Sequence, residues 1–426
     1  MSKFNLTKTE RSWALFDCAE SVFPAIMLST FFPIFFLSIA GGGGSAGALW
    51  WASGLAVSRI IVGIAAPFIG ALIDYRGFKK RLLTISIVGG SASTFLTAII
   101  GTWQPMFLFF MLAHVFWAVS NQIYDSYLPD ITTKDRMHKV SSIGYAWGYG
   151  IGTPIPYVIS LLLVMFGSNF GIDFYAAVRL SVALVAIWML AFSIPMIMNA
   201  RHQYENKIPE KGLFRKVAAD VRDTAVKIAR NKGLLLFLIA YVLYIDGIGT
   251  VSVVGPIFGT AIGLSNEGML LAFLIAPLVS FPFSLLFGKL SKKICATKLI
   301  LAGVFIYCLI AFMAFGLGLG VEAEAVTPAF GLAVFFAMNF LVGTAQGGIW
   351  ALSRSVFGKL IPPESSGEYF GFFEIMGRFA AILGPVLFAF VMSATGRSSF
   401  GVLTIVAVLA VSVIVFLSAR KHIGTN

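Results

Sequence analysis

The chain has 426 residues, of which 58% are hydrophobic and only 12% are charged, and its formal net charge at pH 7 is +12. Soluble domains carry about a quarter charged residues, so this composition excludes an ordinary soluble protein. The three cysteines, Cys18, Cys295 and Cys308, fit neither a disulfide framework nor a metal site. The phosphate-loop and His-Glu-x-x-His motifs do not occur, so we expect no enzyme, no cofactor and no bound metal.

Long apolar runs dominate the chain. A bilayer core about 30 Å thick takes roughly 20 apolar residues per helix, and we find twelve such runs. The first six are 12–40, 48–73, 82–101, 104–128, 140–166 and 174–198. The second six are 233–260, 268–288, 299–320, 329–352, 370–393 and 399–418. We therefore predict an all-α membrane protein with twelve transmembrane helices.

The longest polar stretch divides these helices into two groups of six. The predicted domains are an N-terminal bundle at 1–198, a basic cytoplasmic linker at 199–232 and a C-terminal bundle at 233–426. The linker is amphipathic and basic, which is typical of a segment lying on lipid; a regulatory docking site is the alternative.

Two proline pairs indicate a duplicated six-helix unit. Pro129 and Pro362, 233 residues apart, each follow Leu or Ile in the short loops before the fifth and eleventh spans, and Pro154 and Pro385 follow glycines of those spans 231 residues apart. Transporters built from internal repeats place their substrate site at the repeat interface near the middle of the membrane. We therefore predict two pseudo-symmetric bundles.

The basic residues predict the orientation, because loops rich in Lys and Arg stay in the cytoplasm. Of the 31 Lys and Arg, 27 fall in segments that this topology places inside, and only Arg397 falls in an outer loop. Arg59, Arg179 and Arg378 lie within predicted spans, and we expect Arg179, near a helix end, to snorkel. Both termini are predicted to be cytoplasmic, and the basic surface is expected to meet anionic membrane lipids rather than nucleic acid.

The loop between the second and third spans carries a motif. Its residues are Gly70, Asp74, Arg76, Gly77, Lys79 and Lys80. This loop resembles the signature loop of the major facilitator superfamily of transporters. Physically, we expect Asp74 to face a helix N-terminus and the basic residues to pair across the two halves, forming a latch that holds an inner gate shut. The alternative is that these charges only fix the topology.

A narrower resemblance covers three regions. The segment 12–21, Ser-Trp-Ala-Leu-Phe-Asp-Cys-Ala-Glu-Ser, is similar to the opening of the branch related to the autophagy-associated vacuolar amino-acid permease. Two further regions resemble the same branch. They are 128–130 leading into 140–145, and 351–385, which contains Ile-Pro-Pro and Gly-Pro. The resemblance implies amino-acid-like solutes. That branch usually has Asn where this chain has Glu20.

Ionisable side chains within spans of the first half are candidates for transport, because such groups are expensive in a membrane. Asp17 and Glu20 are three residues apart and share a face of the first helix. Glu20 is placed near mid-membrane, where a carboxylate can carry a proton; a buried pair with Arg59 is the structural alternative. His114 is either a relay or a packing residue.

The second half offers three further candidates. Asp246 lies on the seventh span, the counterpart of the first, so the two carboxylate sites can face each other across a central cavity. Glu374 and Arg378 are spaced i, i+4 in the order that favours a local salt bridge. Arg378 is also a candidate for binding a substrate carboxylate.

These residues together favour a secondary transporter. We predict proton-coupled, alternating-access transport of a small polar or zwitterionic solute by a monomer in the cell (inner) membrane. The expected partners are the small-molecule substrate, protons and membrane lipids. An exporter of amphipathic compounds, such as drugs or siderophores, is the alternative, motivated by 41 Phe and 14 Met. A membrane receptor that does not transport is a third hypothesis.

Overall fold

The structure is a computed structural model that describes residues 5–42, 44–204, 207–209 and 211–423. The described residues are almost entirely helical, and twelve helical segments are long and apolar enough to cross a membrane. Each overlaps one of the twelve predicted spans, so the all-α, twelve-helix prediction is confirmed. Many large apolar side chains, such as Ile64 at 65% and Phe312 at 54%, are exposed on the helices, as expected of surfaces that face lipid.

Contacts divide the chain into two compact units, which are described separately. Unit 1 comprises residues 1–140, 147–221 and 361–372, and unit 2 comprises residues 141–146, 222–360 and 373–426. The predicted domain limits place all of 233–426 in one bundle, and they remain a prediction.

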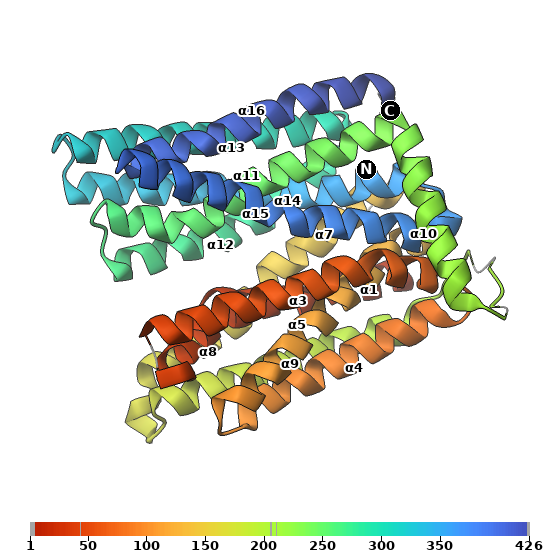
Figure 1. The fold of residues 1–426 in the computed structure, drawn as a ribbon, viewed down its shortest axis with the longest axis horizontal. Helices are drawn as coiled ribbons and strands as arrows, with labels where there is room; N and C mark the ends of the chain where they lie inside the picture. The colour runs from red at the N-terminus through yellow and green to blue at the C-terminus, as the bar shows by residue number, and fades with distance from the viewer. Residues whose placement is uncertain (1–4, 43, 205–206, 210, 424–426) are drawn as a thin grey trace. The chain divides into compact units, whose positions relative to one another are not determined.

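The helices of unit 1 run alongside one another (Figure 1). Its elements are α1 (Lys8–Glu20), η1 (Pro24–Ser29), α2 (Phe31–Ile39), η2 (Ala40–Gly42), α3 (Gly44–Ile73), α4 (Phe78–Ile99), α5 (Trp103–Ser126), α6 (Leu128–Ile131), η3 (Gly148–Gly152), α8 (Pro154–Phe166), η4 (Gly167–Phe170) and α9 (Phe174–Asn199). An aromatic and aliphatic core joins η1, α2, α5 and α9.

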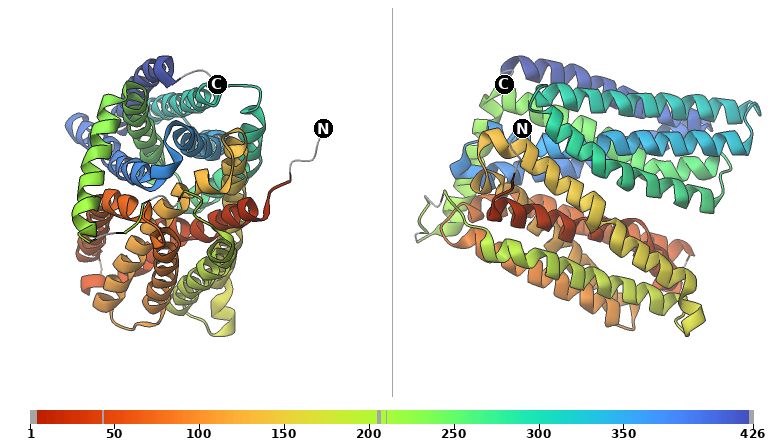
Figure 2. Two further views of the ribbon diagram at one scale, coloured as in Figure 1. Left: turned by 90° about the vertical axis from the view of Figure 1, so that its right-hand side faces the viewer. Right: turned by 180° about the vertical axis from the view of Figure 1, so that it is seen from behind.

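Unit 2 is built mainly from long helices, which the view from behind also shows (Figure 2). They are α11 (Lys232–Ala261), α12 (Asn266–Leu290), α13 (Ala296–Glu322), α14 (Pro328–Leu360) and α16 (Ser398–Ile423). Three helices have residues in both units: α7 (Lys134–Trp147), α10 (Leu213–Arg230) and α15 (Ser366–Thr395), which follows the short turn η5 (Pro363–Ser365). α11 packs against α16, and α12 packs against α14.

Two spans that were predicted as continuous helices are interrupted by π-helical turns. The span 12–40 consists of α1, η1 and α2, and the span 140–166 consists of the end of α7, η3 and α8. Pro24 and Pro154 lie at or just after these turns. Proline lacks a backbone N–H and its ring clashes with the preceding turn, so the backbone widens there.

Candidate functional site

The first candidate region lies at the basic end of unit 1, which we define as the end that carries the loop 74–81. Asp74 follows α3 directly and is fully buried. Its Oδ1 accepts a hydrogen bond from the Gly367 backbone N–H at 2.8 Å, and its Oδ2 accepts one from the Glu368 N–H at 2.9 Å. These donors lie in the first turn of α15, where N–H groups have no partner within the helix. Asp74 therefore caps α15, in agreement with its expected place at a helix N-terminus.

Glycines let α3 and α15 approach closely beside this cap. A Cβ added at Gly70 would overlap the Gly367 carbonyl oxygen, and one at Gly371 would lie 2.7 Å from the Ala66 carbonyl oxygen. Both obstacles are backbone atoms, which have little freedom to move. The small residues thus set the distance at which the Asp74 carboxylate reaches α15.

Lys79 is the buried member of the basic run, with 0% of its side chain exposed. Its Nζ donates to Asp130 Oδ2 at 2.7 Å, to the Ser126 carbonyl oxygen at 3.0 Å and to Ser366 Oγ at 3.0 Å. Asp130 Oδ1 accepts from the Gln203 backbone N–H at 2.9 Å. A buried ion pair is tolerated when both charges have such additional hydrogen bonds.

The segment before α10 adds a second contact to α15. Lys207 donates to Asp220 Oδ2 at 2.9 Å and also forms an ion pair with Glu368. Burial opposes the charge on Lys207, but its hydrogen bonds to Glu368 and Asp220 raise its pKa to about 12. The Arg76 backbone N–H donates to the Lys207 carbonyl oxygen at 2.8 Å.

The remaining motif residues have simpler surroundings. Gly77 has a φ of 82°, the left-handed conformation that favours glycine, and it precedes α4. The side chains of Arg76 and Lys80 are exposed. Of the predicted motif, Gly70, Asp74 and Lys79 therefore contact the start of α15, whereas Gly77 and Lys80 shape and charge the loop.

The second region lies within the membrane-spanning part of unit 1. Asp17 is fully buried, and its Oδ2 accepts a hydrogen bond from Tyr124 Oη at 2.6 Å. Glu20 is partly buried, and its backbone carbonyl oxygen accepts from Trp117 Nε1 at 3.1 Å. Asp17 and Glu20 thus lie on α1 beside aromatic side chains of α5.

Two further candidates of this region are Arg59 on α3 and His114 on α5. His114 is 1% exposed, and its Nδ1 lies 2.8 Å from Ser58 Oγ. Its ring stacks between those of Phe110 and Trp117. Arg59, next to Ser58, is partly buried. The surroundings of His114 are those of a packed and hydrogen-bonded side chain.

The third region lies in unit 2, where Asp246 of α11 is fully buried. Asp246 Oδ1 accepts a hydrogen bond from the Gly384 backbone N–H at 3.0 Å. Its Oδ2 has no hydrogen-bond partner among the residues that the structure describes. A Cβ at Gly384 would overlap the Thr250 hydroxyl and lie 2.8 Å from Asp246 Oδ2, so the glycine permits this approach.

Glu374 and Arg378 form the local salt bridge expected from their spacing. Arg378 Nε lies 2.7 Å from Glu374 Oε1, and the two side chains are 15% and 19% exposed. One buried arginine was missed: Arg354 of α14 donates from Nε to Ser141 Oγ at 3.0 Å and lies 4.4 Å from the Tyr145 ring centroid. Its sequence signal is its place in the stretch 351–385, which carries part of the family resemblance.

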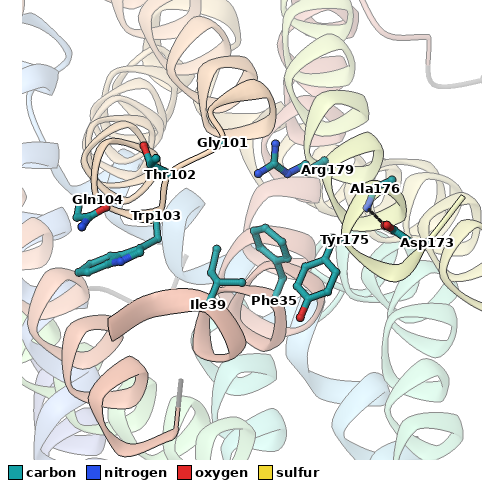
Figure 3. Close-up of a pocket in the computed structure, with 10 residues that line it drawn as sticks. All are labelled: Phe35, Ile39, Gly101, Thr102, Trp103, Gln104, Asp173, Tyr175, Ala176 and Arg179. Carbon is teal, nitrogen blue, oxygen red and sulfur yellow. Dashed lines mark hydrogen bonds between the residues drawn. The ribbon is translucent and has the colours of Figure 1, made fainter. Parts of the chain in front are cut away.

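A cavity of about 660 Å³ opens at the far end of unit 1, which we define as the end that carries the turns 100–103 and 171–173. It is drawn in Figure 3 and is lined by Phe35, Ile39, Gly101, Thr102, Trp103, Gln104, Asp173, Tyr175, Ala176 and Arg179. Its volume lies in the range of small-molecule sites.

Solved structures of known transporters share this fold. The proton:xylose symporter XylE matches with a TM-score of 0.71 and 14% identity, covering 96% of this chain and 95% of that one. A bacterial homologue of the iron transporter ferroportin matches with a TM-score of 0.69 and 12% identity, covering 97% and 98%. Both likenesses show the fold alone. The twelve apolar helices and this fold define an integral multi-pass membrane protein with the major facilitator fold.

Sequence comparisons then give the family. The model of the family described as "Vacuole effluxer Atg22 like" matches residues 52–426, and the chain belongs to that family. The uncharacterised MFS-type transporter YxiO of Bacillus subtilis is 31% identical over 427 residues, covering 99% of this chain and 96% of YxiO. Autophagy-related protein 22-1 of Sclerotinia sclerotiorum is 26% identical over 309 residues, covering 66% of this chain and 50% of that protein. The chain is thus a major-facilitator transporter and not an enzyme.

Proposed function

We propose that this transporter moves a small polar or zwitterionic, amino-acid-like solute with protons by alternating access. The observation that carries the proposal is Asp246, a fully buried carboxylate with one oxygen hydrogen-bonded to Gly384 N–H and the other without a partner in the described part of the chain. An ionised carboxylate is costly in a membrane, so a site that leaves one oxygen open favours exchange of a proton.

Carboxylates on α1 support a second proton position. Asp17 accepts from Tyr124, and Glu20 lies one helical turn further along the same helix. We propose Glu20 and Asp246 as the proton carriers, with Arg59 and Arg378 as partners for a substrate carboxylate. The salt bridge between Arg378 and Glu374 would then have to exchange Glu374 for the substrate.

The contacts at the basic end support a role in gating. Asp74 caps α15 while Lys207 binds Glu368, so several bonds must break together if the start of α15 is to leave α3. We propose that this set of contacts holds one conformational state closed and that it opens and re-forms in each transport cycle. The cell (inner) membrane is the proposed location, with a monomer as the working unit.

Flux measurements test the coupling. The purified protein is reconstituted into liposomes with an imposed pH gradient, and uptake of a mixture of labelled amino acids is measured for the wild type, Glu20→Gln and Asp246→Asn. Proton-driven accumulation should fall at least about tenfold in both variants, whereas exchange of internal for external solute should persist. Asp135→Asn, at an exposed position of α7, is the matched control. Wild-type accumulation in both variants would refute proton coupling through these residues.

One observation favours the second candidate, an exporter of amphipathic compounds. Unit 2 contains an apolar cavity of about 420 Å³ lined in part by Val253, Pro385, Phe388 and Met392. Aromatic and methionine side chains suit ligands of varied shape. Expression in a bacterial host that lacks its own exporters should then raise resistance to lipophilic cations, and unchanged sensitivity across such a panel would count against this candidate.

A further inference from the structure

The far-end cavity of unit 1 places a cation beside aromatic side chains, and its lining also includes Thr102, Gln104 and Asp173. Among the described residues that line it, Arg179, from the second turn of α9, is the one positively charged side chain. In Figure 3 the guanidinium points into the space between Gly101 and Phe35. Phe35, Trp103 and Tyr175 supply aromatic surface around that space.

Arg179 has no carboxylate partner in the part of the chain that the structure describes. The guanidinium lies over the Phe35 ring, with its carbon 6.0 Å from the ring centroid. Asp173, in the same cavity, uses Oδ1 to accept from the Ala176 N–H at 2.7 Å and so caps α9. The guanidinium keeps its planar set of N–H donors for a ligand, and that geometry suits a carboxylate.

The apolar walls are held in place by their own packing. Phe35 is 2% exposed and meets Tyr175 edge to face at 5.7 Å. The Trp103 ring meets the Phe36 ring edge to face with centroids 6.4 Å apart, and it lies tilted against the Trp50 ring with centroids 5.3 Å apart. Rings that are already ordered lose little entropy when a ligand binds, so the cavity is pre-organised for an apolar group beside the cation.

Snorkelling, which the sequence led us to expect for Arg179, describes these contacts poorly. A snorkelling side chain extends past the helix end to reach water or lipid head groups. Arg179 is instead partly buried, lies over the Phe35 ring and lines the cavity.

We propose that this cavity binds an organic carboxylate with a compact apolar group, with Arg179 holding the carboxylate and Phe35, Trp103 and Tyr175 contacting the apolar group. An apolar amino acid and a simple amphipathic monocarboxylate share this chemistry. The role of this cavity as the place where the transported solute first binds rests on the proposed function. Binding of the carboxylate can be measured without transport.

Fluorine NMR of the full-length protein in detergent tests the site, with tryptophan replaced by 5-fluorotryptophan. The Trp103 signal is assigned from its loss in Trp103→Phe. Three probes are titrated: 3-phenylpropionate, phenylalanine and phenethylamine. A saturable shift of the Trp103 signal is expected with one or both carboxylates and not with the amine. A higher affinity for phenylalanine would identify a zwitterion site, and a higher affinity for 3-phenylpropionate would identify a monoanion site.

Variants attribute the binding to the guanidinium. Arg179→Gln should weaken it about tenfold or more, and Arg179→Lys should weaken it less, because a charge-assisted hydrogen bond is lost in the first and partly kept in the second. Arg397→Gln is the matched control, since Arg397 is bound to Glu322 and lies in unit 2. The other tryptophan signals of each variant must match the wild type, which establishes that it is folded.

Several results would overturn the proposal. The first is a binding curve for Arg179→Gln that equals the wild-type curve. The second is a shift of the Trp103 signal with phenethylamine as large as that with the carboxylates. The third is loss of carboxylate binding in phosphatidylglycerol nanodiscs, which would assign Arg179 to a lipid head group. Saturable binding without flux in the liposome assay would instead refute the proposed function and leave this site standing.

Discussion

Two buried aspartates, Asp74 and Asp246, accept hydrogen bonds from backbone N–H groups of the same helix, α15, and their surroundings differ. At Asp74 both carboxylate oxygens accept bonds from the first turn of the helix. At Asp246 one oxygen accepts a bond from Gly384, in the middle of the helix and next to Pro385, and the other has no partner among the described residues.

The difference separates two uses of one side chain. Asp74, which caps a helix N-terminus and has the Lys79 charge nearby, belongs to a set of contacts that must form and break as a whole. Asp246 can gain or lose a proton on its open oxygen while keeping the bond to Gly384. This difference fits the proposed roles of gating for the first aspartate and coupling for the second, and three experiments compare the packing and titration around the two residues.

The largest effect is expected from removing the buried cation beside Asp74. Lys79→Met leaves Asp130 buried without its charge partner, and breaking such a pair destabilises a protein by about 3–5 kcal/mol. The midpoint of chemical unfolding in detergent measures the change. Lys80→Met, at the exposed neighbouring position, should change it little. Equal midpoints for both lysine variants would contradict the role of Lys79.

A smaller effect on stability is expected from adding one methyl group at Gly70, near Asp74, or at Gly384, which donates to Asp246. Gly70→Ala pushes a Cβ against the Gly367 carbonyl oxygen, a backbone atom, and should cost ~1–3 kcal/mol. Gly384→Ala meets the Thr250 hydroxyl first, so it should cost less, since a side chain can adjust. Gly249→Ala, in open space on α11, is the control and should be neutral or slightly stabilising. Thermal unfolding midpoints give the order of stability of the three variants. A lower midpoint for Gly384→Ala than for Gly70→Ala would contradict the difference in packing between the two sites.

The third experiment concerns the pH dependence of stability at Asp74. Burial raises its pKa from 3.8 to about 7, although the Lys79 charge and the N–H groups of Glu368 and Gly367 act in the opposite direction. The folded protein then binds more protons than the unfolded chain between about pH 4 and about pH 7, so the Asp74 contribution to stability is lost as the pH rises through that window.

Asp74→Asn cannot titrate and should flatten this slope. Unfolding midpoints measured at steps from about pH 5 to about pH 8 give the slope for the wild type and the variant. Asp135→Asn, on an exposed carboxylate, should keep the wild-type slope. A slope unchanged in Asp74→Asn would show that another group titrates.

Much of the fold could be predicted because a membrane imposes a simple pattern. Apolar runs and flanking charges located all twelve spans, and the i, i+4 rule found the bridge between Glu374 and Arg378. These are local properties, which a sequence records directly. The π turns in two spans also had a local signal in Pro24 and in the Gly-rich stretch 148–154, but that signal does not say how the backbone responds.

The partners of buried charges could not be predicted in the same way. Lys79, Lys80 and Arg81 are consecutive and chemically alike, and only Lys79 is buried against Asp130, 51 residues away. Arg354 likewise meets Ser141, 213 residues away. Such choices depend on which helix faces reach each other, and a single sequence does not state them.

The turn η3 has a mechanical consequence for unit 1. A Cβ at Gly152 would lie 2.6 Å from Cys18 Cα, and one at Gly148 would overlap the Ser21 hydroxyl. At Gly152 the backbones of α1 and η3 are therefore in direct contact, and at Gly148 the Ser21 side chain packs against the η3 backbone. We therefore expect α1 and η3 to move together as a rigid body in any rearrangement of unit 1. Spin labels on α1 and on α8, which follows η3, should then keep a fixed separation during transport.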